Sequence, residues 1–176
     1  LEGDFTPETE PAAAAEIFGA QIEQARGYFK ALVRDGDLLG LLGPREMPKL
    51  WTRHILNSAV VAELVLDGKT VADVGSGAGL PGIPMALAQP NAHFTLIEPM
   101  ERRSDWLKQM VDELGLKNVT VNRARAEEVG DVFDVEHPGH SQGLLSVTQQ
   151  VRLKRMTLRK LSQHTAGSLT RCVFLP

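Results

Sequence analysis

The sequence predicts an α/β fold with a parallel sheet, because short apolar runs alternate with helical stretches through the middle of the chain. The first run, TVADV (70–74), leads through glycines into a helical stretch at 80–88. A second run, HFTLIE (93–98), is followed by an amphipathic helix over 101–115 and then by NVTVN (118–122). Strands that alternate with helices at this spacing form a parallel sheet with right-handed crossovers. We therefore predict a Rossmann-like core.

Charge divides the chain at one point. Residues 1–135 carry 13 Lys and Arg against 21 Asp and Glu, whereas residues 136–176 carry six basic residues against Glu136 alone. We place the α/β core at 69–135, with DVFDV (131–135) opening a fourth strand. The segment that follows the core is expected to be a divergent basic tail.

Residues 1–68 precede the core and are predicted to form a helical extension. The stretch from Pro11 to Gly36 is expected to be one helix, and a second helix is expected from about Arg45 or Lys49 to Leu66. In the second helix, Trp51, Ile55 and Ala59 form a stripe that should pack on the sheet. The apolar stripe of the first helix repeats at spacings of four and three: Phe18, Ile22, Ala25, Phe29 and Leu32.

Composition excludes several classes of protein. A 176-residue chain with 43% hydrophobic and 23% charged residues suits one soluble globular domain. No apolar run approaches the roughly 20 residues of a membrane span, and the single Cys172 excludes an internal disulfide or a Cys-rich metal site. We expect a cytoplasmic protein with no membrane partner and no metal. The net charge of −3 is not that of a general nucleic-acid binder, and the sequence leaves the oligomeric state open.

A glycine-rich turn follows the first strand, in VADVGSGAGLPGIP (71–84). Ligands of parallel α/β sheets bind beyond the carboxyl ends of the strands, where such a turn lets backbone amides approach them closely. Residues 77–82 satisfy the G-x-G-x-x-G pattern of dinucleotide sites, which is a weak indication by itself. An S-adenosylmethionine site fits the same turn.

Two carboxylates favour S-adenosylmethionine over a dinucleotide. Asp73 lies within the end of the first strand, where a carboxylate suits an ammonium group and repels a pyrophosphate. Glu98 ends the second strand, where it can accept hydrogen bonds from both ribose hydroxyls. The alternatives are a NAD site, or a tight turn with a helix-capping Asp and a solvent-facing Glu. The turn residues expected to lie against the cofactor are Gly75, Ser76, Gly77 and Gly79.

Four stretches together carry a family resemblance: LWTRHILNS (50–58), DVGSGAGLPGIPMA (73–86), EPMERRSDWL (98–107) and RARAEEV (123–129). In this order and spacing they resemble the GidB family of bacterial 16S rRNA guanine-N7 methyltransferases, over roughly residues 12–135. The resemblance implies a class I methyltransferase fold, S-adenosylmethionine as cofactor, and 16S rRNA or the small ribosomal subunit as partner.

The resemblance also implies roles for particular residues. Gly75 and Leu80 would contact the cofactor, and Ala126 and Glu127 would lie beside its adenine. From the residues alone, two adjacent carboxylates at Glu127 and Glu128 are as well explained as a solvated loop.

Seven residues are candidates for contact with RNA, as phosphate or base contacts. Five belong to the second helix or its start, where the alternative for His54 and Asn57 is hydrogen bonding within the protein. The other two open the helix after Glu98, where two cations oppose the helix dipole and the alternative is a solvated helix start. The candidates are Arg45, Lys49, Arg53, His54, Asn57, Arg102 and Arg103.

No catalytic acid or base is assigned. Guanine N7 carries a lone pair and no proton, so placement in line with the methyl group is enough. Before Cys172 the chain has no cysteine for attack on a pyrimidine ring.

The resemblance stops after FDV (133–135). The family pattern continues as an apolar strand with a Ser-Arg-Ala segment whose arginine reaches the cofactor, whereas this chain reads EHPGH (136–140). Pro138 does not suit a central strand. The C-terminal part of the sheet is therefore expected to be missing or replaced. The tail in its place is expected to be out of the ancestral reading frame, disordered, or a divergent RNA-binding segment.

Besides an active methyltransferase, the sequence leaves open a NAD-dependent Rossmann oxidoreductase and an inactive, truncated remnant.

Overall fold

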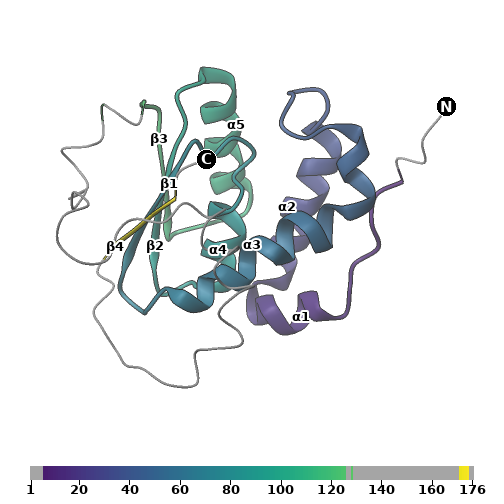
Figure 1. The fold of residues 1–176 in the computed structure, drawn as a ribbon, viewed down its shortest axis with the longest axis horizontal. Coiled ribbons are helices and arrows are strands. Elements are labelled where there is room, and N and C mark those ends of the chain that lie inside the picture. Colours follow the sequence, from purple (N-terminus) through teal and green to yellow (C-terminus); the bar gives the residue numbers. More distant parts are fainter. Residues whose placement is uncertain (1–5, 126–127, 129–170, 175–176) are drawn as a thin grey trace, which may run out of the picture.

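The computed structural model describes residues 6–125, 128 and 171–174, and shows a parallel sheet packed against a layer of helices (Figure 1). The strands lie in the order β3-β2-β1-β4, and every neighbouring pair is parallel. This confirms the predicted Rossmann-like α/β architecture. The strands are β1 (Thr70–Val74), β2 (His93–Ile97), β3 (Val119–Asn122) and β4 (Arg171–Phe174).

Register places the ends of β1 and β2 at the same level. Asp73 is paired with Leu96, and Val74, the last residue of β1, is paired with Ile97, the last residue of β2. Because both strands run in the same direction, the residues that follow them meet at one edge of the sheet. This carboxyl edge holds the glycine turn after β1 and Glu98 after β2.

The fourth strand lies in a part of the sequence where none was expected. The predicted strand at 131–135 falls outside the described residues. The strand beside β1 is instead β4, which lies inside the predicted basic tail and pairs from Thr70 with Arg171 to Asp73 with Phe174. Within the described chain, the edge of β1 is therefore covered by a segment about 100 residues further along the sequence.

The helices match the predicted segments, with two differences in detail. The expected helix over 11–36 is interrupted, because Gly19 adopts a positive φ of 49° at the end of its first part. The second helical segment is continuous over 44–64 but changes its hydrogen-bonding pattern along its length, with Pro48 unable to donate a bond in its first part. In order, the helical elements (η, 3₁₀ or π) are α1 (Ala13–Phe18), η1 (Gly19–Gln21), α2 (Ile22–Asp35), η2 (Pro44–Lys49), η3 (Leu50–Leu56), α3 (Asn57–Ala59), η4 (Val60–Leu64), α4 (Gly82–Ala88) and α5 (Glu101–Glu113).

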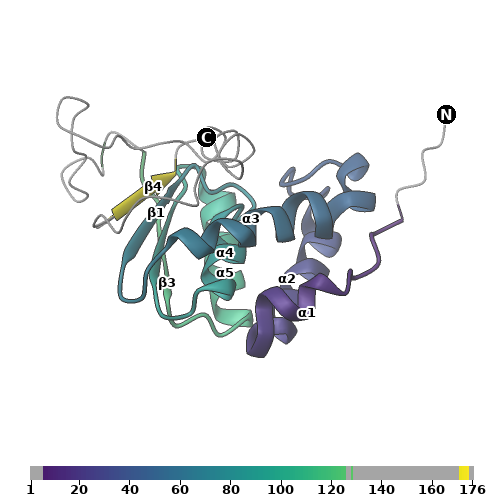
Figure 2. The same ribbon diagram turned by 60° about the horizontal axis from the view of Figure 1, so that its bottom comes forward.

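The described helices gather on one face of the sheet (Figures 1 and 2). The strand order β3-β2-β1 means that both crossovers step in the same direction, so right-handed connections place α4 and α5 on the same side. The main core lies there, between the sheet, these two helices and the N-terminal extension. A much smaller cluster on the other face contains Ala72, Val74 and Ile97.

The extension packs mainly on helices, which corrects the expectation that its second helix packs on the sheet. Trp51 is fully buried and stacks on Phe29 of α2, with ring centroids 5.0 Å apart. The later part of the segment, α3 and η4, lies against α4. The reason is that α4 and α5 already occupy this face of the sheet, so the extension forms a further layer. In the described part of the chain, no helix has the length and apolar character needed to cross a bilayer.

Two leucines give a matched test of this core. Leu96 in β2 is fully buried, whereas Leu38 is 80% exposed. We expect Leu96→Ala to lower the free energy of unfolding by about 2–5 kcal/mol and Leu38→Ala to change it by no more than about 0.5 kcal/mol. Urea denaturation of both variants measures the difference. Equal losses would contradict the assignment of Leu96 to the core.

Candidate cofactor site

The turn after β1 depends on glycines that adopt backbone angles unsuited to other residues. Gly75, Gly77 and Gly79 have φ values of 78°, 54° and 82°, which lie in the left-handed region that only glycine adopts at little cost. The backbone conformation of the turn therefore requires glycine at the alternate positions 75, 77 and 79. At Gly79 a Cβ atom would also lie 2.5 Å from Cδ1 of Ile83, so this glycine allows close packing of the turn on α4 as well.

Ser76 fastens the start of the turn to the neighbouring strand. Its hydroxyl donates to the carbonyl oxygen of Asp73 at 2.8 Å and accepts from the amide of Ile97 at 3.1 Å. The amides of Gly75 and Ser76 both donate to the carbonyl of Ile97. Ser76 is buried, so its role in this structure is to join the ends of β1 and β2.

Asp73 is a buried carboxylate directed at the first turn of α4. It is 2% exposed, and its Oδ2 accepts the amide of Gly82 at 3.1 Å. A Cβ atom at Gly82 would lie 2.7 Å from this oxygen and 2.2 Å from Cδ2 of Leu96. Only glycine at position 82 therefore allows the helix to approach the strand this closely.

Burial makes Asp73 hard to ionise. Loss of solvent raises its pKa from 3.8 to about 6; the Gly82 amide opposes this shift, and the nearby charge of Glu98 adds to it. A carboxylate in this state gains from a cationic partner, since an opposite charge lowers the free energy of the ionised form.

Glu98 connects the two loops at the carboxyl edge. It is 3% exposed; its Oε2 accepts the amide of Gly77 at 2.9 Å and its Oε1 accepts the amide of Met100 at 3.0 Å. A carboxylate has about four acceptor positions, so two bonds to amides leave capacity for hydroxyl donors. The role of Glu98 in binding a ribose stays a prediction.

The two carboxylates of this site suit S-adenosylmethionine better than a dinucleotide. They match an ammonium group and a pair of ribose hydroxyls. A dinucleotide site needs free amides at the N-terminus of the helix for its pyrophosphate, but here Asp73 already occupies the amide of Gly82. A negatively charged group would have to displace a buried carboxylate.

Arg102 and Arg103 contact the loop that follows α2. Arg102 donates to the carbonyl of Leu39 at 2.7 Å and Arg103 donates to the carbonyl of Gly40 at 3.1 Å. These bonds give the two cations favourable partners at a helix N-terminus that would otherwise disfavour them. Contact of either arginine with RNA stays a prediction.

The candidates on the second helical segment are mostly exposed, and two of them lie within 4.0 Å of an acidic side chain. Nε2 of His54 lies 2.7 Å from Oε2 of Glu46, and Arg53 lies 3.4 Å from the same oxygen. The bond from His54, more than the charge of Arg53, holds the pKa of Glu46 below its usual value. His54 is thus hydrogen-bonded within the protein, as the alternative expected, while Arg45, Lys49, Arg53 and Asn57 are exposed.

Two predicted cofactor residues, Ala126 and Glu127, lie outside the described residues. Next to them, the Glu128 carboxylate accepts the amide of Arg125 at 2.9 Å. Leu80 lies at the end of the glycine turn, half-buried and packed against the main core.

Sequence reasoning missed two residues of this site. Gly82 is the last glycine of the G-x-G-x-x-G pattern, so the signal was present but was interpreted only as part of a dinucleotide motif. Tyr28 is fully buried and donates its hydroxyl to the carbonyl of Ala78 in the turn at 2.7 Å. It follows Ala25 and precedes Leu32 at helical spacing, but nothing in the sequence connects it with a residue 50 positions away.

Comparison with known proteins identifies a family. The GidB family, described as rRNA small subunit methyltransferase G, matches residues 21–153. Proteins of that name from Corynebacterium glutamicum (strain R) and Leifsonia xyli subsp. xyli are 55% and 56% identical to this chain over 120 and 121 residues, or 68% and 69% of it. These alignments cover 54% and 57% of the relatives, so the chain spans about half the length of the curated relatives it matches.

The chain is also similar to a solved structure. The C-terminal domain of precorrin-6Y C5,15-methyltransferase from Rhodobacter capsulatus is 18% identical, with a TM-score of 0.39, and the match covers 60% of this chain and 71% of that one.

The raised pKa of Asp73 predicts a pH dependence of stability. The folded state binds the proton more tightly than the unfolded state, so the stability contributed by the neutral carboxyl group is lost as pH rises from about 4 through about 6. Asp73→Asn does not titrate. From pH 5 to pH 7.5, the free energy of unfolding of this variant relative to that of the unsubstituted chain should therefore rise by about 1–2 kcal/mol. Urea denaturation at each pH measures this difference.

Leu38→Ala provides the control for that measurement, because it changes an exposed side chain and no ionisable group. This variant should keep a constant difference from the unsubstituted chain over the same pH range. A constant difference for Asp73→Asn as well would contradict the burial of an ionisable Asp73.

Proposed function

We propose that this chain, which belongs to the GidB family of small-subunit rRNA methyltransferases, binds S-adenosylmethionine at the glycine turn and serves in N7-methylation of a guanine of 16S rRNA. The observation that carries the proposal is the pair of buried carboxylates, Asp73 and Glu98, at the ends of adjacent strands beside that turn. Membership of a methyltransferase family indicates the same cofactor.

Asp73 and Glu98 bind opposite ends of the cofactor in this proposal. Asp73 offers its charge to the ammonium group of the methionine part, and Glu98 accepts hydrogen bonds from the ribose hydroxyls. Gly75, Gly77 and Gly79 allow the backbone between them to lie directly against the nucleoside. The bound cofactor supplies a methyl group on a positively charged sulfur.

The work left to the protein is to orient the reactants. Guanine N7 carries no proton, so no side chain has to act as a base, and alignment of the base with the cofactor can supply most of the rate enhancement. The rigid attachment of the turn to β2, through Ser76 and Glu98, serves this purpose. It fixes one reactant before the other arrives.

The exposed cations of the extension are the proposed contacts to RNA. Arg45, Lys49 and Arg53 are exposed, and they belong to a helical segment whose later part packs against α4, the helix that follows the glycine turn. Residues 1–135 are acidic in balance, so affinity for RNA has to come from such local cations or from the shape of an assembled particle.

A titration of the chain with S-adenosylhomocysteine and with NAD tests the cofactor. We expect saturable calorimetric binding of S-adenosylhomocysteine alone. Glu98→Gln should weaken this binding about 10- to 100-fold, because its NH2 group replaces an oxygen that accepts a backbone amide and its remaining oxygen is a weaker acceptor for the ribose hydroxyls. Affinity should also fall below pH 6, where Asp73 binds a proton instead of the ammonium group.

Glu113 is the matched control, because it is the last residue of α5 and far from the carboxyl edge. Glu113→Gln should bind S-adenosylhomocysteine as the unsubstituted chain does. Binding of NAD in preference, or equal binding by Glu98→Gln, would refute the assignment of this site.

A second prediction concerns RNA. The double variant Arg45→Ala, Lys49→Ala should bind small ribosomal subunits more weakly, and the slope of log K against log salt should become shallower by about one for each cation removed from a phosphate. Its affinity for S-adenosylhomocysteine should not change. Filter binding at several salt concentrations measures the slope.

Lys117→Ala is the control for that experiment, since this exposed lysine precedes β3 at the opposite edge of the sheet. An unchanged slope for the double variant, or an equal change for Lys117→Ala, would rule out the proposed RNA surface.

A further inference from the structure

The N-terminal extension reaches into the proposed cofactor site through one side chain. Tyr28 of α2 is fully buried, and its hydroxyl donates to the carbonyl of Ala78 at 2.7 Å. Ala78 lies between Gly77 and Gly79, the two glycines of positive φ at the centre of the turn. The extension therefore contacts the backbone of the turn between two glycines of positive φ.

The turn is held by two side chains. Tyr28 of the extension donates to the carbonyl of Ala78, and Glu98 after β2 accepts the amide of Gly77, the residue before Ala78. Burial, and then the nearby charge of Asp73, raises the pKa of Tyr28 well above 10, so the phenol keeps its proton and remains a donor at neutral pH.

We propose that Tyr28 is a positioning residue for the cofactor: its hydroxyl holds the glycine turn in the shape that binds S-adenosylmethionine. The inference rests on the proposed function. Three glycines give the turn many alternative conformations, and ordering them on binding would reduce affinity. A hydrogen bond that already fixes the turn removes that cost from the binding step.

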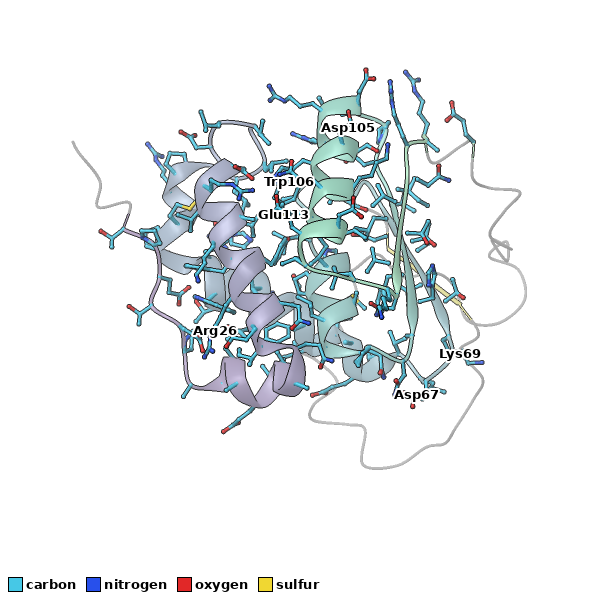
Figure 3. The ribbon with its side chains drawn as sticks, turned by 180° about the vertical axis from the view of Figure 1, so that it is seen from behind. Arg26, Asp67, Lys69, Asp105, Trp106 and Glu113 are labelled. Carbon is cyan, nitrogen blue, oxygen red and sulfur yellow. The ribbon has the colours of Figure 1, made fainter. Side chains whose placement is uncertain are left out.

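Trp106 supplies a comparison within the same cluster of side chains. Its Nε1–H donates to Oδ2 of Asp35 at 2.8 Å, and its ring lies 6.5 Å from that of Tyr28. Figure 3 shows Trp106 extending from α5 towards α2. Trp106 thus joins the extension to the core as Tyr28 does, but its hydrogen bond goes to α2 and not to the turn.

Two variants separate positioning from plain stabilisation. Tyr28→Phe removes one hydroxyl, and Trp106→Phe removes one N–H donor from the same core. Affinity for S-adenosylhomocysteine is measured by calorimetry well below the thermal transition of each variant, beside its urea denaturation. We expect Tyr28→Phe to weaken binding about 5- to 20-fold, and Trp106→Phe to lose stability with its affinity within about twofold of the unsubstituted chain.

Each result has a distinct meaning. If the unsubstituted chain does not bind S-adenosylhomocysteine, the proposed function itself fails. If it binds and Tyr28→Phe binds equally well, or if both variants weaken binding alike, the positioning role of Tyr28 is overturned.

A spectroscopic readout covers the case in which Tyr28→Phe does not fold. Tyr28 is the single tyrosine of the sequence, so the chain labelled with 3-fluorotyrosine gives one ¹⁹F resonance. Addition of S-adenosylhomocysteine should shift this resonance, because the acceptor of the phenol lies in the turn that contacts the ligand. A resonance that stays in place at saturation would overturn the proposal.

Discussion

The carboxylate of Glu98 is the interaction on which the carboxyl edge of this protein depends. It binds the amide of Gly77 after β1 and the amide of Met100 after β2, and so joins the two loops that follow these strands. Parallel pairing brings the loops to the same level, Ser76 joins the ends of the strands, and Glu98 extends this connection to the centre of the glycine turn. The cost of burying that charge is offset by bonds to two donors, with acceptor capacity left for a ligand.

Asp73 depends on the same arrangement in a different way. Its carboxylate has one amide partner, from Gly82, and forms no ion pair within the described part of the chain, so burial leaves it with a raised pKa of about 6. Such a residue is unfavourable for stability at neutral pH. Its presence is understandable if a cationic ligand completes its surroundings, which is the chemistry proposed for S-adenosylmethionine. The burial of Asp73 thus lowers the free energy of unfolding at a position where binding of a cationic ligand needs a negative charge.

The extension is part of the site as well as of the core. Tyr28 binds the turn directly, and the loop after α2 receives bonds from Arg102 and Arg103 at the start of α5. The extension thus contacts the carboxyl edge at two places. Tyr28 contacts the glycine turn, and the loop after α2 contacts the start of α5. We infer that removal of the extension would disturb the cofactor turn even though most of its residues lie outside the α/β core.

The local pattern of the sequence predicted the centre of the fold well. The apolar runs at 70–74 and 93–98 predict buried strands, and the glycines at 75, 77 and 79 mark a turn with positive φ angles, so β1, β2 and the turn could be inferred without a structure. Contacts between residues far apart in the sequence could not be inferred in this way. The bond from Tyr28 to Ala78 spans 50 residues, and the pairing of β4 with β1 brings together segments about 100 residues apart, and neither leaves a periodic trace. The mixed helical pattern over 44–64 depends on packing against α2 and α4 in the same way.

Amide hydrogen exchange, with and without S-adenosylhomocysteine, tests the central claim most directly. If Asp73, Glu98 and the glycines between the strands form the cofactor site, the ligand should slow exchange at 75–82 and at 97–101 and leave the amino edge of the sheet unchanged. Slower exchange spread evenly over the chain, or none at the glycine turn under saturating ligand, would contradict the account.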